Sequence, residues 1–130
     1  MENITVYFKV HDFDCAIQLI DQKLGINATE SWLKGDIIPN RDGKVRRMNS
    51  SWILKRTFQK LESVNQEIVD LFSTLNETEI INMSQQYSCE LSVVVKMHNE
   101  NNIGLNFDKG LLSYFSRLGV DLDLDIYMLS

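Results

Sequence analysis

The chain has 130 residues, of which 44% are hydrophobic and 24% are charged, and its formal net charge is −5. These values are ordinary for a globular protein and exclude an intrinsically disordered chain, so we expect a single domain over residues 1–130. Residues 1–10 lack the apolar run of a signal peptide, and no stretch approaches the roughly 18 apolar residues of a membrane span. We therefore expect a cytoplasmic protein with no membrane partner.

The charge is unevenly distributed along the chain. Residues 34–60 contain eight basic and two acidic residues, which gives this segment a charge of +6. The rest of the chain contains five basic and sixteen acidic residues, a charge of −11. An acidic background of this size opposes binding to a polyanion, so we expect no nucleic-acid partner.

The first half of the chain predicts three strands and one helix. Residues 4–11 alternate in hydrophobicity and predict a strand. Apolar residues at three- and four-residue steps from Phe13 to Leu24 predict a helix, begun by a cap at Asp12 or Asp14 and ended by Gly25. We expect an edge strand over residues 31–36 and a further strand over residues 51–57. The loop over residues 37–50 is rich in turn formers, and a loop of this length is typically functional or mobile.

The middle of the chain predicts two helices followed by a hairpin. The apolar stripe from Leu61 to Leu75 predicts a helix, and residues 76–86 predict a second, shorter one. Residues 89–98 alternate and predict a strand. The polar residues 99–102 suit a hairpin loop, after which residues 103–107 are predicted to return as a strand.

The end of the chain predicts one more helix and a final strand. Asp108 caps the helix and Gly119 ends it. Residues 121–128 alternate strictly and predict a strand. We expect its inward face to consist of Leu122, Leu124, Ile126 and Met128.

Because nearly every predicted strand alternates, we expect a mostly antiparallel sheet with one buried face and one hydrated face. The predicted fold class is therefore α+β: a two-layer sandwich in which a sheet of five to six strands carries three to four helices on one face. The order of the strands cannot be read from periodicity.

A series of short motifs along this order of elements resembles a known family. These motifs are Leu24-Gly25-Ile26, Trp32 with Gly35, Trp52 at the start of a strand, Gly104-Leu105 with Phe107-Asp108, Leu118-Gly119, and Asp123 with Asp125-Ile126-Tyr127. In order and spacing they resemble the bacterial domain of unknown function 4279 over nearly the whole chain. The resemblance implies a bacterial or phage protein and an immunity-type role, in which the protein neutralises a toxin. It carries over no catalytic residues.

The acidic residues of the last predicted strand, Asp121, Asp123 and Asp125, form one row. Alternate strand residues lie roughly 7 Å apart, which is too wide for neighbouring carboxylates to hold one cation. The row is therefore either a hydrated face that blocks edge pairing or a surface for a basic protein partner, such as a toxin. The two histidines, His11 and His98, end two strands and meet only if those strands are neighbours. Two histidines do not make a zinc site, so we expect no metal and no cofactor.

A second candidate site is the basic loop between the two tryptophans. Its residues are Trp32, Arg41, Arg46, Arg47 and Trp52. Arginine forks suit carboxylates and phosphates, and an indole can stack on a guanidinium. The alternative is an ordinary hydrated loop with both tryptophans in the core.

No catalytic motif is recognisable, so we expect no catalytic residues and favour a non-enzymatic protein. The first hypothesis is a binding protein, including an immunity-type inhibitor, that occupies a protein partner. The second is a binder of a small phosphate- or carboxylate-bearing ligand, or an enzyme, that uses the loop over residues 35–50. The third is a structural homodimer, and the oligomeric state stays open between monomer and homodimer.

Overall fold

The computed structural model describes residues 2–39, 42–98 and 104–129, and these residues form five strands and four α-helices. The strands are β1 (Glu2–His11), β2 (Glu30–Trp32), β3 (Ser51–Phe58), β4 (Ser88–Met97) and β5 (Asp121–Met128). The helices are α1 (Ile17–Leu24), α2 (Val64–Ser73), α3 (Glu77–Ser84) and α4 (Lys109–Leu118), and a short 3-10 helix over Leu61–Ser63 precedes α2.

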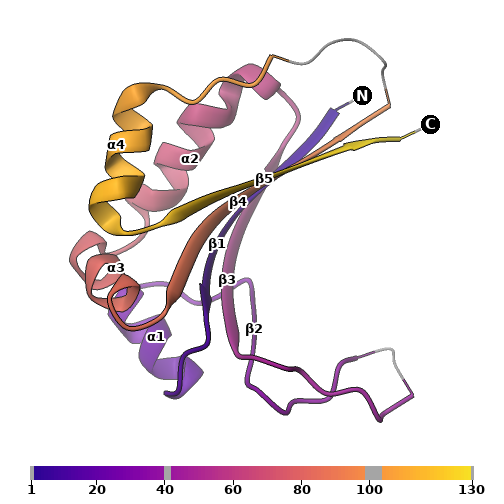
Figure 1. The fold of residues 1–130 in the computed structure, drawn as a ribbon, viewed down its shortest axis with the longest axis vertical. Helices are drawn as coiled ribbons and strands as arrows, with labels where there is room; N and C mark the ends of the chain where they lie inside the picture. Colours follow the sequence, from indigo (N-terminus) through magenta and orange to yellow (C-terminus); the bar gives the residue numbers. More distant parts are fainter. Residues whose placement is uncertain (1, 40–41, 99–103, 130) are drawn as a thin grey trace.

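The elements form two layers. All four helices lie on the same side of the sheet, and the other face of the sheet carries no helix (Figure 1). The strand order is β2-β3-β1-β4-β5, and every neighbouring pair is antiparallel except β4 and β5, which run parallel. The predicted α+β class, with a mostly antiparallel sheet and helices on one face, is confirmed.

The core lies between the sheet and the helices, and β1 is its centre. Ile4, Val6, Phe8 and Val10 of β1 are fully buried. Their partners on β4 are all apolar, and on β3 three of the four partners are apolar, Val6 pairing with Arg56; Phe8, for example, lies between Leu54 and Leu91. The alternation of these three strands therefore gives the buried face correctly, because each apolar row points toward the helices.

The predicted strand over residues 103–107 is wrong for the part of it that the structure describes. Residues 104–107 form no strand and lead directly into α4, while the predicted hairpin loop over residues 99–102 lies outside the described residues. Strand β5 runs parallel to β4, and a parallel neighbour needs a crossover rather than a hairpin. Leu105 and Phe107 pack against the core as part of that crossover. An extended segment with one packed side alternates in the same way as a strand.

Two local predictions in the first half of the chain also differ from the structure. Strand β2 ends at Trp32, because Asp36 accepts a hydrogen bond from the Leu33 amide (2.8 Å) and turns the chain. Helix α1 begins after Ala16 without a side-chain cap, since Asp14 instead accepts a hydrogen bond from the Tyr87 hydroxyl (2.9 Å). By contrast, Asp108 caps α4 as predicted and Gly119 ends it in the left-handed conformation.

Candidate functional site

The face of the sheet without helices, here called the open face, is polar and mixed in charge. Paired rows run across it from strand to strand; one consists of Glu30, Ile53, Lys9, Glu90 and Asp121. Glu30 forms an ion pair with Lys55 (3.0 Å), and this hydrogen bond raises the pKa of the Lys55 ammonium. The open face therefore carries charges of both signs on its central strands, such as Lys9 and Glu90, as well as on its edge strands β2 and β5.

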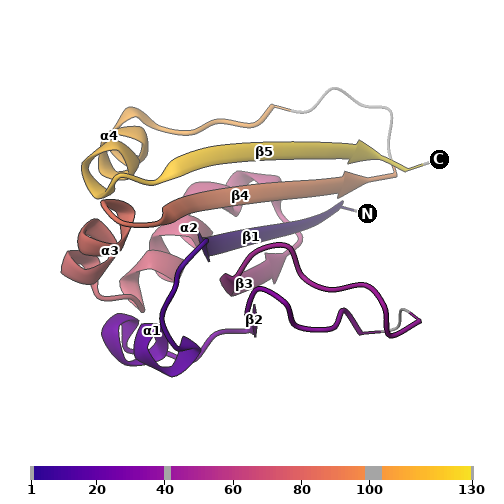
Figure 2. The same cartoon turned by 60° about the horizontal axis from the view of Figure 1, so that its bottom comes forward.

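The long loop between β2 and β3 projects away from the helices at the lower right of Figure 1 and extends to the right in Figure 2. Its described residues, 33–39 and 42–49, are here called the arm. Backbone hydrogen bonds join its two sides: the Gly35 amide donates to the Arg47 carbonyl (2.9 Å) and the Arg47 amide donates to the Asp36 carbonyl (2.7 Å). A further bond from the Ile38 amide to the Val45 carbonyl (3.0 Å) continues this pairing, so the arm has a defined backbone.

The predicted tryptophan–arginine site is only partly brought together. The guanidinium of Arg47 lies 3.7 Å above the centre of the Trp32 ring. Arg46 Nη1 donates to the Gly35 carbonyl (2.9 Å) on the same arm. Trp52 is fully buried on the helix side of the sheet, where its Nε1 donates to Asp21 (2.8 Å), so it shares no surface with Trp32. Arg41 lies outside the described residues.

His11 links three strands beside the base of the arm. Its Nδ1 lies 2.8 Å from Ser51 Oγ on β3, and its Nε2 lies 2.9 Å from Glu90 Oε1 on β4. Ser, His and Glu in this order resemble a hydrolytic triad, but the Ser51 side chain is 1% exposed and cannot meet a substrate. These two hydrogen bonds, here called the His11 tie, connect β1 with β3 and β4.

The two histidines lie at opposite ends of the sheet. His11 pairs with Ser88 at the start of β4, whereas His98 follows the other end of β4. His98 lines a cavity of about 540 Å³ together with Lys96, Thr57 and Gln59. In the part of the chain that the structure describes, no group of three or more His, Cys, Asp or Glu side chains is arranged to hold a metal ion. Strands β1 and β4 are neighbours, but their antiparallel register keeps His11 and His98 apart, so the two histidines do not meet.

The predicted acidic row lies on β5, which ends the sheet. Asp121, Asp123 and Asp125 are exposed on the open face, opposite Glu90, Ser92 and Val94 of β4. Among the described residues, no lysine, arginine or histidine lies within ion-pair distance of any of the three. Burial, and to a smaller extent the Asp121 charge, raises the pKa of the Cys89 thiol to about 12.

The other face of β5 carries an apolar row that the helices leave uncovered. Leu124, Ile126 and Met128 pair with the buried residues Val93, Val95 and Met97 of β4, yet they are 41%, 45% and 53% exposed. Their direction toward the helix side was predicted from the alternation. Their exposure was not, because periodicity gives the side to which a residue points and not what lies above it.

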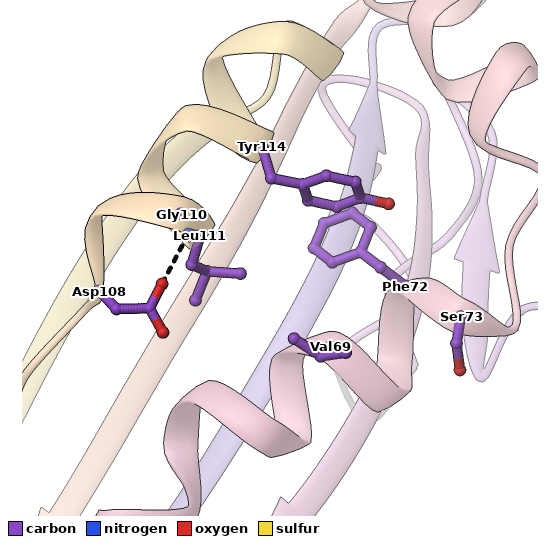
Figure 3. Close-up of a pocket in the computed structure, with 7 residues that line it drawn as sticks. All are labelled: Val69, Phe72, Ser73, Asp108, Gly110, Leu111 and Tyr114. Carbon is purple, nitrogen blue, oxygen red and sulfur yellow. Dashed lines mark hydrogen bonds between the residues drawn. The ribbon is translucent and has the colours of Figure 1, made fainter.

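A groove of about 440 Å³ lies between α2 and α4 (Figure 3). The Phe72 and Tyr114 rings meet edge to face in it, and burial raises the pKa of the Tyr114 hydroxyl. Asp108 lies at the rim but is used as the α4 cap, accepting from the Leu111 amide (2.7 Å). The groove is lined mainly by apolar groups.

Comparison with known proteins adds one finding. Residues 2–129 match a protein family described as "Domain of unknown function (DUF4279)". Neither a search of curated proteins nor a search of solved structures found a match. Among the described residues, no helix has both the length and the hydrophobicity to cross a membrane. The chain belongs to the DUF4279 family.

Proposed function

We propose that this chain is a non-enzymatic protein-binding domain that pairs a basic, extended segment of a partner protein with the outer edge of β5. The observation that carries the proposal is the combination of two rows on one edge strand. Asp121, Asp123 and Asp125 form an exposed acidic row on one face, and Leu124, Ile126 and Met128 form an exposed apolar row on the other.

An edge strand offers backbone donors and acceptors to a further strand, and many proteins bind peptides by adding a strand in this way. Strand β5 is eight residues long, and β4 is its one strand neighbour in the described part of the sheet. By comparison, the opposite edge strand, β2, has three residues. Strand β5 is therefore the longer template for pairing.

The two rows select the chemistry of the partner. An added strand places alternate side chains beside the acidic row and the others beside the apolar row. A segment that alternates Lys or Arg with Val, Ile or Leu satisfies both rows at once. A second copy of β5 in antiparallel pairing would bring aspartates beside aspartates on the same face, which is destabilising. The acidic row thus attracts a basic partner and opposes a homodimer through this edge.

The proposal is tested with a peptide of alternating lysine and valine, capped at both ends and labelled with a fluorophore. We expect it to bind, and the double variant Asp123→Asn/Asp125→Asn to weaken binding about tenfold at low salt, because each exposed ion pair contributes about 0.7 kcal/mol. The matched control is Glu62→Gln/Glu79→Gln, which removes the same charge from the helix layer and should leave the affinity nearly unchanged.

Backbone pairing is tested separately with two peptides that are N-methylated at alternate amides. Because alternate amides of an added strand point at β5 and the others point away, one methylated peptide should lose binding and the other should retain it. Equal binding of both methylated peptides, or equal weakening by both charge-removing variants, would contradict strand addition at β5. Sedimentation of the protein alone tests the homodimer, which the proposal predicts to be absent at this edge.

An immunity-type inhibitor is the specific form of this proposal in which the basic partner is a toxin. In that form the Asp123→Asn/Asp125→Asn variant should protect less well against the toxin's activity than the Glu62→Gln/Glu79→Gln control. The association rate with the toxin should also fall as the salt concentration rises, because electrostatic steering between an acidic inhibitor and a basic target weakens with ionic strength.

A further inference from the structure

The arginines of the arm differ from those elsewhere in the described structure. Arg56 of β3 pairs with Glu67 (3.2 Å), and Arg117 of α4 pairs with Glu77, whose pKa the Arg117 hydrogen bond lowers. No Asp or Glu of the described residues lies within ion-pair distance of Arg46 or Arg47. Within the described part of the chain, the two arm guanidiniums therefore form no ion pair, although Asp36 and Asp42 belong to the same arm.

Each arm guanidinium nevertheless has a contact of its own, with Trp32 or with the Gly35 carbonyl. The Cζ atom of Arg47 lies 3.7 Å above the centre of the Trp32 ring, and the Arg47 backbone is fixed by hydrogen bonds with Gly35 and Asp36. Arg46 is fixed through its Nη1 bond to the Gly35 carbonyl. A stacked guanidinium keeps its in-plane N–H donors available, and those donors match the two oxygens of a carboxylate or phosphate.

Trp32 supplies a further donor at the same place. Its Nε1 is buried and has no hydrogen-bond partner in the described structure, whereas Nε1 of Trp52 has Asp21. A buried donor without an acceptor costs about 1–3 kcal/mol, so an arrangement that gives it an acceptor is favoured. Trp32 pairs with Ser51 on β3, next to the His11 tie, so its ring rests on a fixed part of the sheet.

We propose that Trp32, Arg46 and Arg47 form a binding site for an oxyanion, the carboxylate or phosphate group of a small ligand. The in-plane donors of Arg47 take two oxygens of the anion, and a shift of the stacked Arg47 lets Trp32 Nε1 reach one of them. Arg46 supplies a second positive charge. The site is separate from β5, the proposed site of a basic peptide, and it requires no catalytic step.

The two indole N–H groups make the test specific, because the chain has two tryptophans, one at the site and one in the core. The protein, labelled with ¹⁵N, is titrated with inorganic phosphate and, separately, with malonate, against sodium chloride at matched ionic strength. We expect the Trp32 indole signal to shift in a saturable manner with a Kd of about 1 mM, while the Trp52 signal stays in place. The Trp32→Phe variant assigns the two signals.

Two variants distinguish the contribution of the planar Arg47 guanidinium from that of positive charge alone. Arg47→Lys keeps the charge and loses the stacked fork, so we expect the affinity for the anion to fall about tenfold. Lys23→Gln removes one positive charge from exposed α1 and should leave the titration unchanged. Saturation by phosphate but not malonate, or by malonate but not phosphate, supports the site and identifies the source of the oxyanion.

Three results would overturn the proposal. The first is no shift of the Trp32 signal with either anion. The second is the same shift with sodium chloride, which would indicate general screening of charge. The third is a shift that depends on protein concentration without added anion, which would assign the arm to a contact between copies. None of these results bears on peptide binding at β5, so the two proposals fail separately.

Discussion

Trp32 and Trp52 lie on opposite faces of the sheet, although both belong to the paired strands β2 and β3. Trp32 pairs with Ser51, and the residue next to Ser51 is Trp52, so the alternation of β3 sends the two indoles to opposite sides. Trp52 is held by Asp21 inside the core, and Trp32 is covered by Arg47 at the base of the arm. The two rings therefore lie in separate environments, one in the core and one on the open face beside the arm.

The bond between Trp52 and Asp21 predicts a large effect of a small substitution. Asp21→Ala leaves the buried Trp52 Nε1 without its acceptor and also removes the acceptor of the Ala28 amide. We expect the free energy of unfolding in urea to fall by about 2–3 kcal/mol. Trp32→Phe, which removes no hydrogen bond, should lower it much less. Equal effects of the two substitutions would contradict the assignment of Trp52 to the core.

The two glycines that end helices predict unequal costs of a methyl group. Gly25 and Gly119 both have positive φ, 82° and 77°. A Cβ on Gly25 meets open space, whereas a Cβ on Gly119 would lie 2.5 Å from Ser84 Oγ. Gly25→Ala should cost about 1 kcal/mol from the backbone alone, and Gly119→Ala should cost more. Thermal unfolding of the two variants checks the order, and a smaller cost at Gly119 would be inconsistent with the packing of α3 beside that turn.

The acidic row predicts a gain in stability when one charge is removed. Asp121 lies directly opposite Glu90, so Asp121→Asn relieves repulsion between two carboxylates and should raise the unfolding free energy by about 0.5 kcal/mol at low salt. Asp123→Asn, opposite Ser92, should change it less. The difference between the two variants should shrink at high salt because screening weakens the repulsion. A larger gain from Asp123→Asn would refute this pairing.

The buried Cys89 thiol predicts a loss of stability at alkaline pH. Burial raises its pKa from 9.0 to about 12, so the folded state keeps the proton while the unfolded state releases it. The contribution of the protonated Cys89 thiol to the free energy of unfolding is present below pH 9. It is lost as the pH rises from 9 toward 12, at up to about 1.4 kcal/mol per pH unit. Relative to its value at pH 8, the free energy of unfolding of the wild type should therefore fall more steeply above pH 9 than that of Cys89→Ala. Parallel pH profiles would contradict it.

Much of the fold follows from the sequence because most strands have one packed face. The alternation of residues 4–11 and 89–98 gives the buried side of β1 and β4, and Asp108 and Gly119 give the ends of α4. The crossover could not be found this way, since Leu105 and Phe107 alternate like a strand while packing against the core. Pairing partners depend on contacts between distant segments, so the parallel neighbour of β5 has no local signal.

The candidate sites were predictable to different extents. The acidic row of β5 follows from strict alternation, and the basic arm follows from charge and turn residues. Trp52 does not belong to the basic-loop site, because Trp32 pairs with Ser51 and the adjacent Trp52 therefore points to the other face of the sheet. Strand β2 has three residues, too few for periodicity to predict this pairing. The exposed apolar row at Leu124, Ile126 and Met128 depends on where the helices stop, and that is a property of packing.

Hydrogen exchange on β5 in the presence of the alternating lysine–valine peptide tests the central claim most directly. Strand addition gives new hydrogen-bond partners to the outward-facing amides of residues 121–128 and leaves those paired with β4 unchanged. We predict slower exchange at alternate amides of β5, and no comparable change in β2, the helices or the arm. Bound peptide without protection in β5, or with protection concentrated in the α2–α4 groove or on the arm, would contradict the claim.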